Sequence, residues 1–205
     1  MSPFFPAAQF DVVAIAASAG GLHALSQVIF SLPKSFGAAI VVVQHLDPRA
    51  PSLLAEILAR RSVLPVTTAQ SGQLLQVGTI YIAPPDWHVL VNPNQTLSLQ
   101  QTARVHFTRP AADILFESVA NSCGARGIGI VLTGTGQDGA SGIQAIKAQG
   151  GLTIAQNPEE AEFSGMPSAA IQTHAVDLVL PLTQIAPTLI QLVNSERIGS
   201  DQDRA

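Results

Sequence analysis

Cysteine, tyrosine, tryptophan and charge are all scarce in this sequence of 205 residues. Its single cysteine, Cys123, excludes an internal disulfide framework, and the cytoplasm is the compartment that fits such a chain. Cys123 lies in a helix-like stretch, ILFESVANSCG, where we predict a small buried hydrophobic residue. With one tryptophan and one tyrosine, the chain also lacks the aromatic platforms on which nucleic-acid bases stack.

Basic blocks and long apolar runs are missing as well. Charged residues make up 12% of the chain and the net charge is -4, so nucleic acid is not expected as the main partner. The N-terminus has no basic region followed by a long apolar core, which argues against a secretory signal. Because every apolar run is short and interrupted, we expect no membrane insertion.

Apolar residues are plentiful, at 47% of the chain. This content and length suit one compact domain with a sizeable core. We expect that domain to span residues 10–195, between a peripheral N-terminal segment, residues 1–9, and a polar C-terminal tail, residues 196–205.

Strand-like and helix-like patterns alternate along the chain. Strands are predicted at Val12–Ala17, Ala39–Val43, Val63–Thr68, Thr79–Ala83, Ile128–Leu132, Leu152–Ala155 and Val176–Leu180. Several of these runs are almost entirely Val, Ile, Ala and Leu, as in parallel strands that are buried on both faces. Helical periodicity lies between them, which predicts a doubly wound α/β fold: a mostly parallel sheet with helices on both faces.

One stretch, HVLVNPNQTLSLQ at residues 88–100, differs from this rhythm. Two alternating segments flank Asn92-Pro93-Asn94-Gln95, which predicts an antiparallel hairpin near one edge of the sheet.

The first predicted strand ends in an unusual turn, within VVAIAASAGGLHAL at residues 12–25. Ser18 stands where a buried strand becomes a helix, and such a turn aims its backbone N–H groups at whatever binds there. The turn is a position for a nucleophile, a cradle for phosphate, or only a tight loop.

Two further strand ends carry polar side chains, His45 after the second strand and Asp138 in a glycine loop. Ligands of open α/β sheets bind at the carboxyl ends of the strands, so Ser18, His45 and Asp138 would meet there. A serine needs a base to take its proton, imidazole is that base at neutral pH, and a carboxylate orients the imidazole. The plainer alternatives are a loop-capping histidine and two helix N-caps.

The same glycine loop suggests a different function. GTGQDG, residues 134–139, fits the G-x-G-x-x-G pattern of dinucleotide-binding sites, and Glu159 and Glu160 follow about twenty residues later, where an acid would bind ribose. Against this reading, the motif does not follow the first strand, and the two acids lie in a loop beyond a strand end.

Taken together, the segments resemble the catalytic domain of the chemotaxis protein-glutamate methylesterase family, CheB. AIAASAGG resembles its serine turn and VVVQHLDP its histidine strand. VGTIYIAPPDWHVLV, RPAADILFESVA, VLTGTGQDGASG and GGLTIAQNPEEAEFSGMPSAAI continue the likeness in order, so it covers roughly residues 10–195.

The resemblance implies a serine hydrolase with Ser18 as nucleophile, His45 as general base and Asp138 as orienting carboxylate. Its reactions would be hydrolysis of glutamyl γ-methyl esters and deamidation of glutamine, with no metal and no organic cofactor. Candidates for the oxyanion hole and substrate contacts are Ala19, Gly20, Thr135, Gly136 and His88. For His88 the alternative is a hairpin residue whose polar atoms are satisfied within the fold.

The implied partners are the cytoplasmic helices of methyl-accepting chemoreceptors. Arg49, Arg60 and Arg61 would favour acidic receptor helices, although arginines at a helix end are often only solvated. The family's typical member carries an N-terminal receiver domain, and the roughly ten residues before the serine strand here are too few for one. We therefore expect a stand-alone form, regulation by a separate receiver protein as a further partner, or a fragment of a longer chain.

Two positions depart from the family pattern. Thr135 stands where the family usually has methionine, and Ala19 where a hydroxyl residue is common, so we expect an effect on specificity. The alternatives to an esterase are a catalytically silent CheB-like binding domain and, with less support, a nucleotide-dependent oxidoreductase.

Overall fold

The computed structural model of the chain describes residues 10–46 and 52–194. The predicted peripheral segment 1–9 and the polar tail 196–205 lie outside the described residues, as does Arg49.

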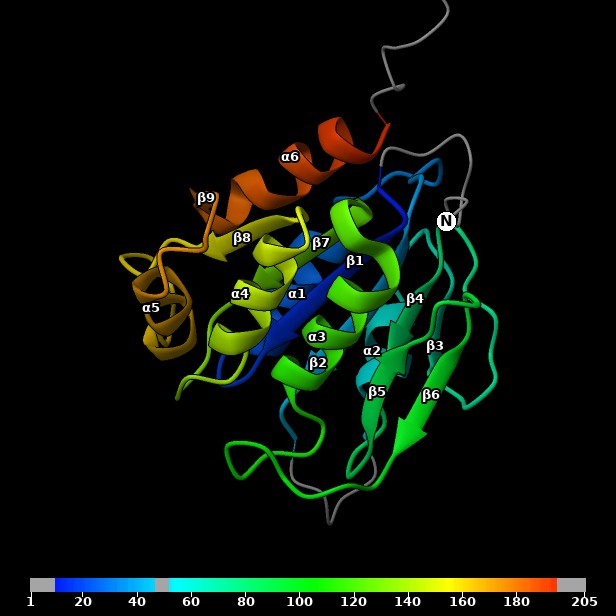
Figure 1. Cartoon of the computed structure of the whole chain (residues 1–205). Helices are drawn as coiled ribbons and strands as arrows, with labels where there is room; N and C mark the ends of the chain where they lie inside the picture. The colour runs from blue at the N-terminus through cyan, green and yellow to red at the C-terminus, as the bar shows by residue number, and fades with distance from the viewer. Residues whose placement is uncertain (1–9, 47–51, 195–205) are drawn as a thin grey trace, which may run out of the picture.

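A seven-stranded sheet forms the centre of the molecule, and its neighbouring strands all pair in parallel (Figure 1). In spatial order the strands are β3 (Val66–Thr68), β4 (Ile80–Ile82), β2 (Ala39–Gln44), β1 (Val12–Ala17), β7 (Gly127–Val131), β8 (Leu152–Gln156) and β9 (Leu178–Leu180). The predicted parallel sheet is therefore confirmed.

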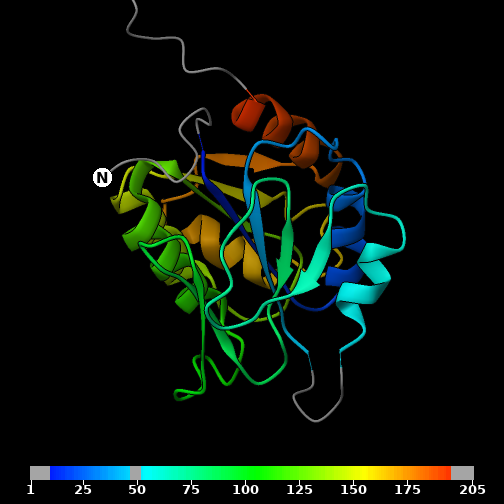
Figure 2. The same cartoon turned by 90° about the vertical axis from the view of Figure 1, so that its right-hand side faces the viewer.

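Helices cover both faces of this sheet. Their bounds are α1 (Gly21–Ile29), α2 (Leu54–Ala59), α3 (Ala112–Cys123), α4 (Ala140–Ala148), α5 (Gly165–Gln172) and α6 (Leu182–Asn194), with a 3₁₀ turn at Gly124–Arg126. Figure 2 shows α1 and α2 on one side of the sheet and α3 on the other. The side chains of β1 alternate between two cores: Val13 and Ile15 pack with α1, α2 and α6, and Val12 and Ala14 pack with α3, α4 and α5.

The predicted hairpin forms from β5 (His88–Val91) and β6 (Leu97–Gln100), which pair antiparallel as a two-stranded sheet of their own. It is fixed to α3 through the backbone of Val91, which bonds to Ser118 Oγ at 2.9 Å and to Ser122 Oγ at 2.7 Å. The hairpin also bonds to the loop between β3 and β4, because Gly72 N donates to Leu97 O at 2.8 Å.

Strand β3 is shorter than the apolar pattern predicts and begins at Val66 instead of Val63. Pro65 has no N–H to donate to a ladder. Just before it, the Ser62 hydroxyl accepts a hydrogen bond from Leu64 N at 3.1 Å, which closes a local turn.

The strand order places a topological switch point between β1 and β7. From β1 the chain passes to β2, then to the edge strand β3 and back to β4 on one side, and later from β7 through β8 to β9 on the other side. In open α/β sheets the crevice at such a point, beyond the carboxyl ends of the strands, is where ligands bind. The loops that carry Ser18 and Asp138 leave the sheet on either side of this point.

No helix in residues 10–46 and 52–194 is long and apolar enough to cross a membrane.

The close approach of α3 and α4 depends on Gly142. A Cβ atom at this position would lie 2.5 Å from Phe116 Cβ and 3.1 Å from the backbone Cα of Asp113. Because such crowding forces backbone shifts, we expect Gly142→Ala to lower the free energy of unfolding by about 1–3 kcal/mol. Urea denaturation measures this, with Ser141→Ala on the exposed side of α4 as the control. Equal stabilities of the two variants would contradict this account of the packing.

Candidate active site

Ser18 directly follows β1, whose last residue is Ala17. Its position is fixed by two backbone hydrogen bonds: Ser18 N donates to Thr133 O at 3.0 Å, and Gly21 N donates to Ser18 O at 2.9 Å. Gly20, the N-cap of α1, has a φ of 74°, a left-handed conformation that glycine adopts without strain. The strand therefore turns sharply into α1, and Ser18 stands at the edge of the sheet.

The loop after β7 packs directly on this serine. A Cβ atom on Gly134 would lie 2.8 Å from Ser18 Cβ and would overlap the sulfur of Met166. The start of α5 closes the other side of this loop, since a Cβ atom on Gly165 would lie 3.0 Å from Gly136 N. Glycine at these positions lets three segments that are distant in sequence meet beside Ser18.

His45 follows β2 and contacts Asp138. Its backbone N donates to Ala17 O at 3.0 Å, which ties the histidine to the end of β1. Its ring atom Nε2 lies 2.7 Å from Asp138 Oδ2, and the two side chains are 11% and 2% exposed. The structure thus brings two of the predicted site residues together, 93 positions apart in the chain.

Asp138 is held at the N-terminus of α3. Its Oδ2 accepts from Ala112 N at 2.7 Å and from the Thr108 hydroxyl at 3.3 Å, and its Oδ1 accepts from Asp113 N at 3.0 Å. The N-cap of the following helix, α4, is Gly139. Asp138 therefore caps the neighbouring helix α3. It is not the N-cap of α4, the helix that it precedes, so the alternative of a simple N-cap does not account for its position.

These bonds keep Asp138 ionised. Burial alone raises the pKa of its carboxyl group, but the hydrogen bond from His45 and those from the backbone of Asp113 and Ala112 outweigh burial, so the net pKa lies below the usual value. A carboxylate that stays charged can orient an imidazole and stabilise its cation.

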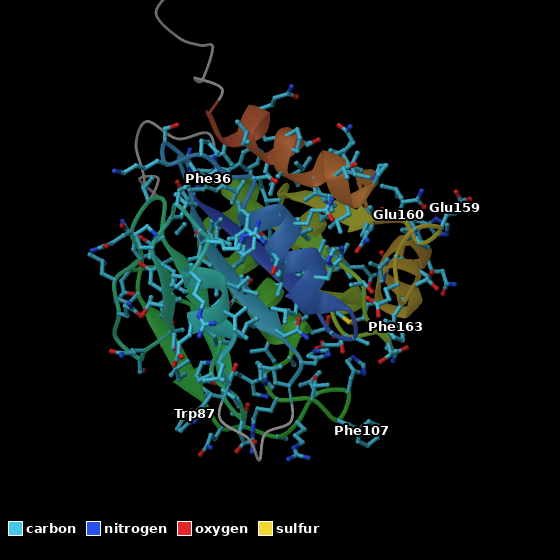
Figure 3. The ribbon with its side chains drawn as sticks, turned by 180° about the vertical axis from the view of Figure 1, so that it is seen from behind. Phe36, Trp87, Phe107, Glu159, Glu160 and Phe163 are labelled. Carbon is cyan, nitrogen blue, oxygen red and sulfur yellow. The ribbon has the colours of Figure 1, made fainter. Side chains whose placement is uncertain are left out.

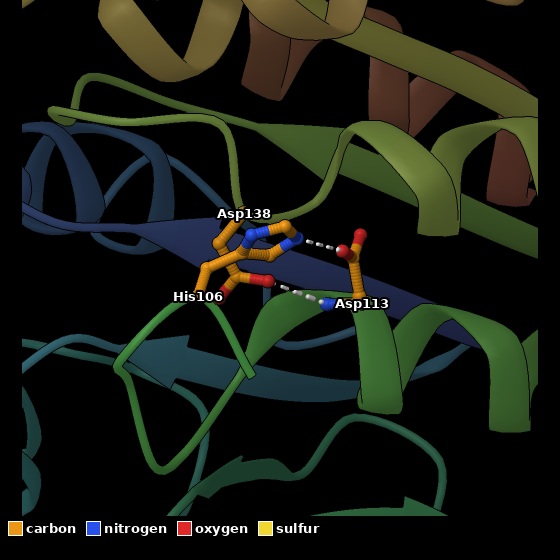
Figure 4. Close-up of side chains that lie close together, drawn as sticks. All are labelled: His106, Asp113 and Asp138. Atoms are coloured by element: carbon orange, nitrogen blue, oxygen red, sulfur yellow. Dashed lines mark hydrogen bonds and ion pairs between the residues drawn. The ribbon is translucent and has the colours of Figure 1, made fainter. Parts of the chain in front are cut away.

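Asp113 makes the reverse connection, and Figure 4 shows its bonds to Asp138 and His106. From the first turn of α3, its Oδ1 accepts from Gly139 N at 2.9 Å and from Gly142 N at 2.8 Å, and so caps α4. Its Oδ2 lies 3.1 Å from His106 Nε2. Burial raises the pKa of Asp113, the bond from Gly142 lowers it, and the charge of Asp138 raises it further; the net shift is upward. Asp113 was not among the predicted site residues, although an acid in the first turn of a helix is a visible signal in the sequence.

Ser18 and His45 line one cavity of about 390 Å³. Its other lining residues are His106, Phe107, Thr108, Thr135, Gly136, Gln137 and Asp138. In the part of the chain that the structure describes, Ser18 Oγ makes no hydrogen bond, to His45 or to any other residue. A serine and its base often lie apart until a substrate binds. The cavity thus holds the predicted nucleophile, base and carboxylate together.

Four backbone N–H groups around Ser18 have no partner among the described residues: those of Ala19, Gly20, Thr135 and Gly136. Gly20 directly precedes α1, so the positive end of that helix also faces the serine turn. Unused donors at this position are what an oxyanion hole requires.

His88, the remaining predicted contact, lies elsewhere. It is fully buried in β5, and both ring nitrogens are bonded: Nδ1 accepts from Ala111 N at 3.1 Å, and Nε2 lies 3.1 Å from Ala103 O. It does not line the cavity with Ser18. These contacts favour the alternative, a hairpin residue satisfied within the fold.

The glycine loop offers little support for dinucleotide binding. Gly139 N is taken by Asp113, and Glu160, the proposed ribose ligand, bonds to Gln156 Nε2 and Leu182 N, both at 2.9 Å. Figure 3 shows Glu159 and Glu160 beside α5 and α6, far from Phe107 on the wall of the 390 Å³ cavity.

The structure also disfavours a cysteine nucleophile and a metal site. Cys123 is partly buried, and burial raises the pKa of its thiol to about 12, which makes it a poor nucleophile.

One group of potential metal ligands occurs in the described ranges: His106, Asp113 and Asp138 place ligand atoms within 4.8 Å of one another. Every carboxylate oxygen in that group already accepts a hydrogen bond or contacts a histidine.

The lowered pKa of Asp138 predicts a pH effect on stability. A carboxyl group whose pKa is lower in the folded than in the unfolded chain stabilises the fold above its unfolded pKa, near 4, and this contribution is lost as pH falls through the folded pKa. We expect Asp138→Asn to lower the free energy of unfolding by about 1–3 kcal/mol at pH 7, and by progressively less below pH 4.

Urea denaturation at several pH values checks this. Glu159→Gln, which neutralises an exposed side chain, is the control and should change stability at pH 7 by less than about 0.5 kcal/mol. An Asp138→Asn effect of the same size at pH 7 and pH 3 would show that the lowered pKa contributes nothing.

Comparison with known proteins adds independent evidence. The family model for the CheB methylesterase matches residues 13–189. A putative protein-glutamate methylesterase/protein-glutamine glutaminase of Leptospira interrogans is 37% identical over 89% of this chain and 95% of its own length. The protein-glutamate methylesterase/protein-glutamine glutaminase of Pyrococcus horikoshii is 38% identical over 94% of this chain but only 53% of its own length.

A solved structure agrees with these sequence matches. The CheB methylesterase catalytic domain of Thermotoga maritima superposes with a TM-score of 0.87 at 36% identity, covering 90% of this chain and 99% of that one. The family model, the relatives and the solved structure thus agree over most of the chain, and this chain belongs to the CheB methylesterase family.

Proposed function

We propose that this chain is a protein-glutamate methylesterase that also deamidates protein glutamine. The names of its relatives support both activities. The observation that carries the proposal is the contact between His45 and Asp138 on the wall of a cavity that also contains Ser18. Both reactions transfer an acyl group from a side-chain ester or amide to water.

In the first half of the reaction, Ser18 Oγ attacks the side-chain carbonyl and His45 takes the serine proton. Since His45 Nε2 contacts Asp138, Nδ1 is the ring nitrogen left for that proton in this orientation. The imidazolium then returns the proton to the leaving methanol or ammonia. Water, activated by the same imidazole, attacks the acyl-enzyme and releases glutamate and free Ser18.

The negative oxygen of each tetrahedral intermediate needs donors that are already in place. The unused N–H groups of Ala19 and Gly20 on one side, and of Thr135 and Gly136 on the other, are suited to this role. Thr135 replaces the methionine that is usual in the family, so the cavity wall is more polar at this point.

Gln44 holds the serine and histidine segments in register. This residue is 6% exposed, and its Nε2 donates to Ser18 O at 2.7 Å and to His45 O at 3.1 Å. A single side chain thus bridges the backbones that carry nucleophile and base. We assign Gln44 a positioning role.

The substrate class is a protein. We propose the cytoplasmic helices of chemoreceptors as that protein, the cytoplasm as the location, and residues 10–195 as the catalytic unit. A separate receiver protein is the proposed source of regulation. No metal and no organic cofactor takes part in this scheme.

Loss of the nucleophile tests the proposal. Wild-type protein should release methanol from a methylated chemoreceptor fragment, and Ser18→Ala should be at least about a thousandfold slower, because removal of one triad member abolishes most of the acceleration. Ser141→Ala on exposed α4 is the matched control and should keep full activity. Equal rates for wild type and Ser18→Ala would exclude this mechanism, and a folded but inactive wild type would exclude the activity.

Replacing the bridging glutamine tests its positioning role. Gln44→Leu keeps the side-chain size but removes both hydrogen bonds that join the serine and histidine segments, so we expect kcat to fall about 100-fold, as for a reacting group displaced by about 1 Å. The rate at which a fluorophosphonate labels Ser18 should fall in parallel, whereas Gln144→Leu on the surface should change neither. An unchanged labelling rate in folded Gln44→Leu would argue that the bridge is only structural.

A further inference from the structure

Ser18 borders a second and larger cavity, of about 810 Å³, whose lining does not include His45. This α1–α2 groove is lined by residues that include Leu22 and Phe30 from the α1 segment, and Ile57, Arg60 and Arg61 from the α2 segment. The triad chemistry described above uses none of these five side chains. The reaction mechanism therefore does not account for the presence of this groove beside Ser18.

The floor of the groove is apolar and open. Leu22 is 44% exposed and Ile57 37% exposed, although both side chains are large and hydrophobic. Such side chains in an open groove between two helices suit the apolar face of a third helix. An occupant with an apolar stripe would cover both.

Cations lie at one end of the groove. Arg61 stacks on Phe30, with its guanidinium carbon 4.9 Å from the ring centre. Within residues 10–46 and 52–194, neither Arg60 nor Arg61 forms an ion pair, and both are exposed. The chain as a whole carries more acids than bases, 14 against 10, so these two adjacent arginines are a local excess of positive charge on an acidic chain.

The opposite end of the groove is the reaction centre. There the carboxylate of Glu162 lies beside Gly20, since a Cβ atom on Gly20 would lie 2.7 Å from Glu162 Oε2. This negative charge disfavours another carboxylate next to Ser18 but not a neutral ester or amide. The groove thus has an end for a neutral group and an end for an acidic one.

The length of α1 sets the spacing between the two ends. Ser18 precedes this nine-residue helix, and Phe30, which contacts Arg61, directly follows it. At a rise of 1.5 Å per residue, the arginines lie roughly 15 Å from Ser18. In a bound helix, 11 residues span about 16 Å, close to that distance, and they bring the two positions back to the same face because 3.6 residues make one turn.

We infer that the α1–α2 groove binds an amphipathic helix of the protein substrate, with the esterified glutamate at Ser18 and an acidic side chain about three turns away at Arg60 and Arg61. This inference rests on the proposed function. The acidic side chain would contribute binding energy remote from the reacting group, and would select which glutamates of a long helix reach the serine.

Charge reversal in the groove tests the inference. We expect Arg60→Glu to lower kcat/KM for a methylated helical substrate at least about tenfold, because opposite charges that attract become like charges that repel. Hydrolysis of a small ester that cannot reach the groove should be unchanged. Lys34→Glu makes the same change in net charge at an exposed residue that does not line the groove, and it is the control.

The substrate side gives a second test. Two otherwise identical helical peptides carry one methyl-glutamate and one glutamate, placed 11 or 5 residues apart. Wild type should hydrolyse the peptide with the 11-residue spacing faster than the other. Arg60→Glu should instead hydrolyse faster a peptide of the same spacing in which lysine replaces the unmodified glutamate. The inference would be overturned if Arg60→Glu lowered kcat/KM equally for the helical substrate and the small ester, or lowered neither. It would also be overturned if wild type showed no preference for the 11-residue spacing.

Binding separates this inference from the proposed function. The same peptides are titrated against Ser18→Ala, with and without Arg60→Glu, and peptide fluorescence anisotropy is followed. Tight binding that Arg60→Glu weakens supports the groove even if wild type hydrolyses no ester. Absence of binding by the acidic peptide overturns the groove even if a small ester is hydrolysed.

Discussion

The carboxylate of Asp138 is the interaction on which the rest of the site depends. It accepts backbone N–H groups from the first turn of α3 and contacts His45 with the same oxygen that accepts from Ala112. Burial alone would raise its pKa and favour the neutral form, and the charge is retained because the hydrogen bond from His45 and the N–H groups of the helix end together outweigh burial. A residue that orients the proposed base therefore also joins the glycine loop to α3.

Much of this arrangement was predictable from sequence. Continuous apolar runs gave the strands of the parallel sheet, and the rule that ligands bind at carboxyl ends of strands brought Ser18, His45 and Asp138 to one edge. The hairpin followed from its alternating pattern. These features depend on local composition, which a single sequence displays directly.

Other parts were not predictable because they depend on contacts between distant segments. Nothing local to Gln44 shows that its amide bridges two backbone carbonyls, and nothing local to Asp113 shows that it caps another helix. The hairpin position of His88 suggested a contact with substrate, whereas its surroundings bury it completely. The two arginines of α2 were visible as charges, but their relation to Ser18 follows from the packing of α2 beside α1.

The exchange of caps between α3 and α4 has a consequence for protein engineering. Asp138, which precedes α4, caps α3, and Asp113, within α3, caps α4, so each segment is incomplete without the other. A chimera that takes the α3 segment from one relative and the glycine loop from another would combine two segments that cap each other in the native fold but come from different proteins. The α3 segment and the glycine loop should therefore be exchanged together. The effect of a substitution in one segment on stability should depend on the sequence of the other.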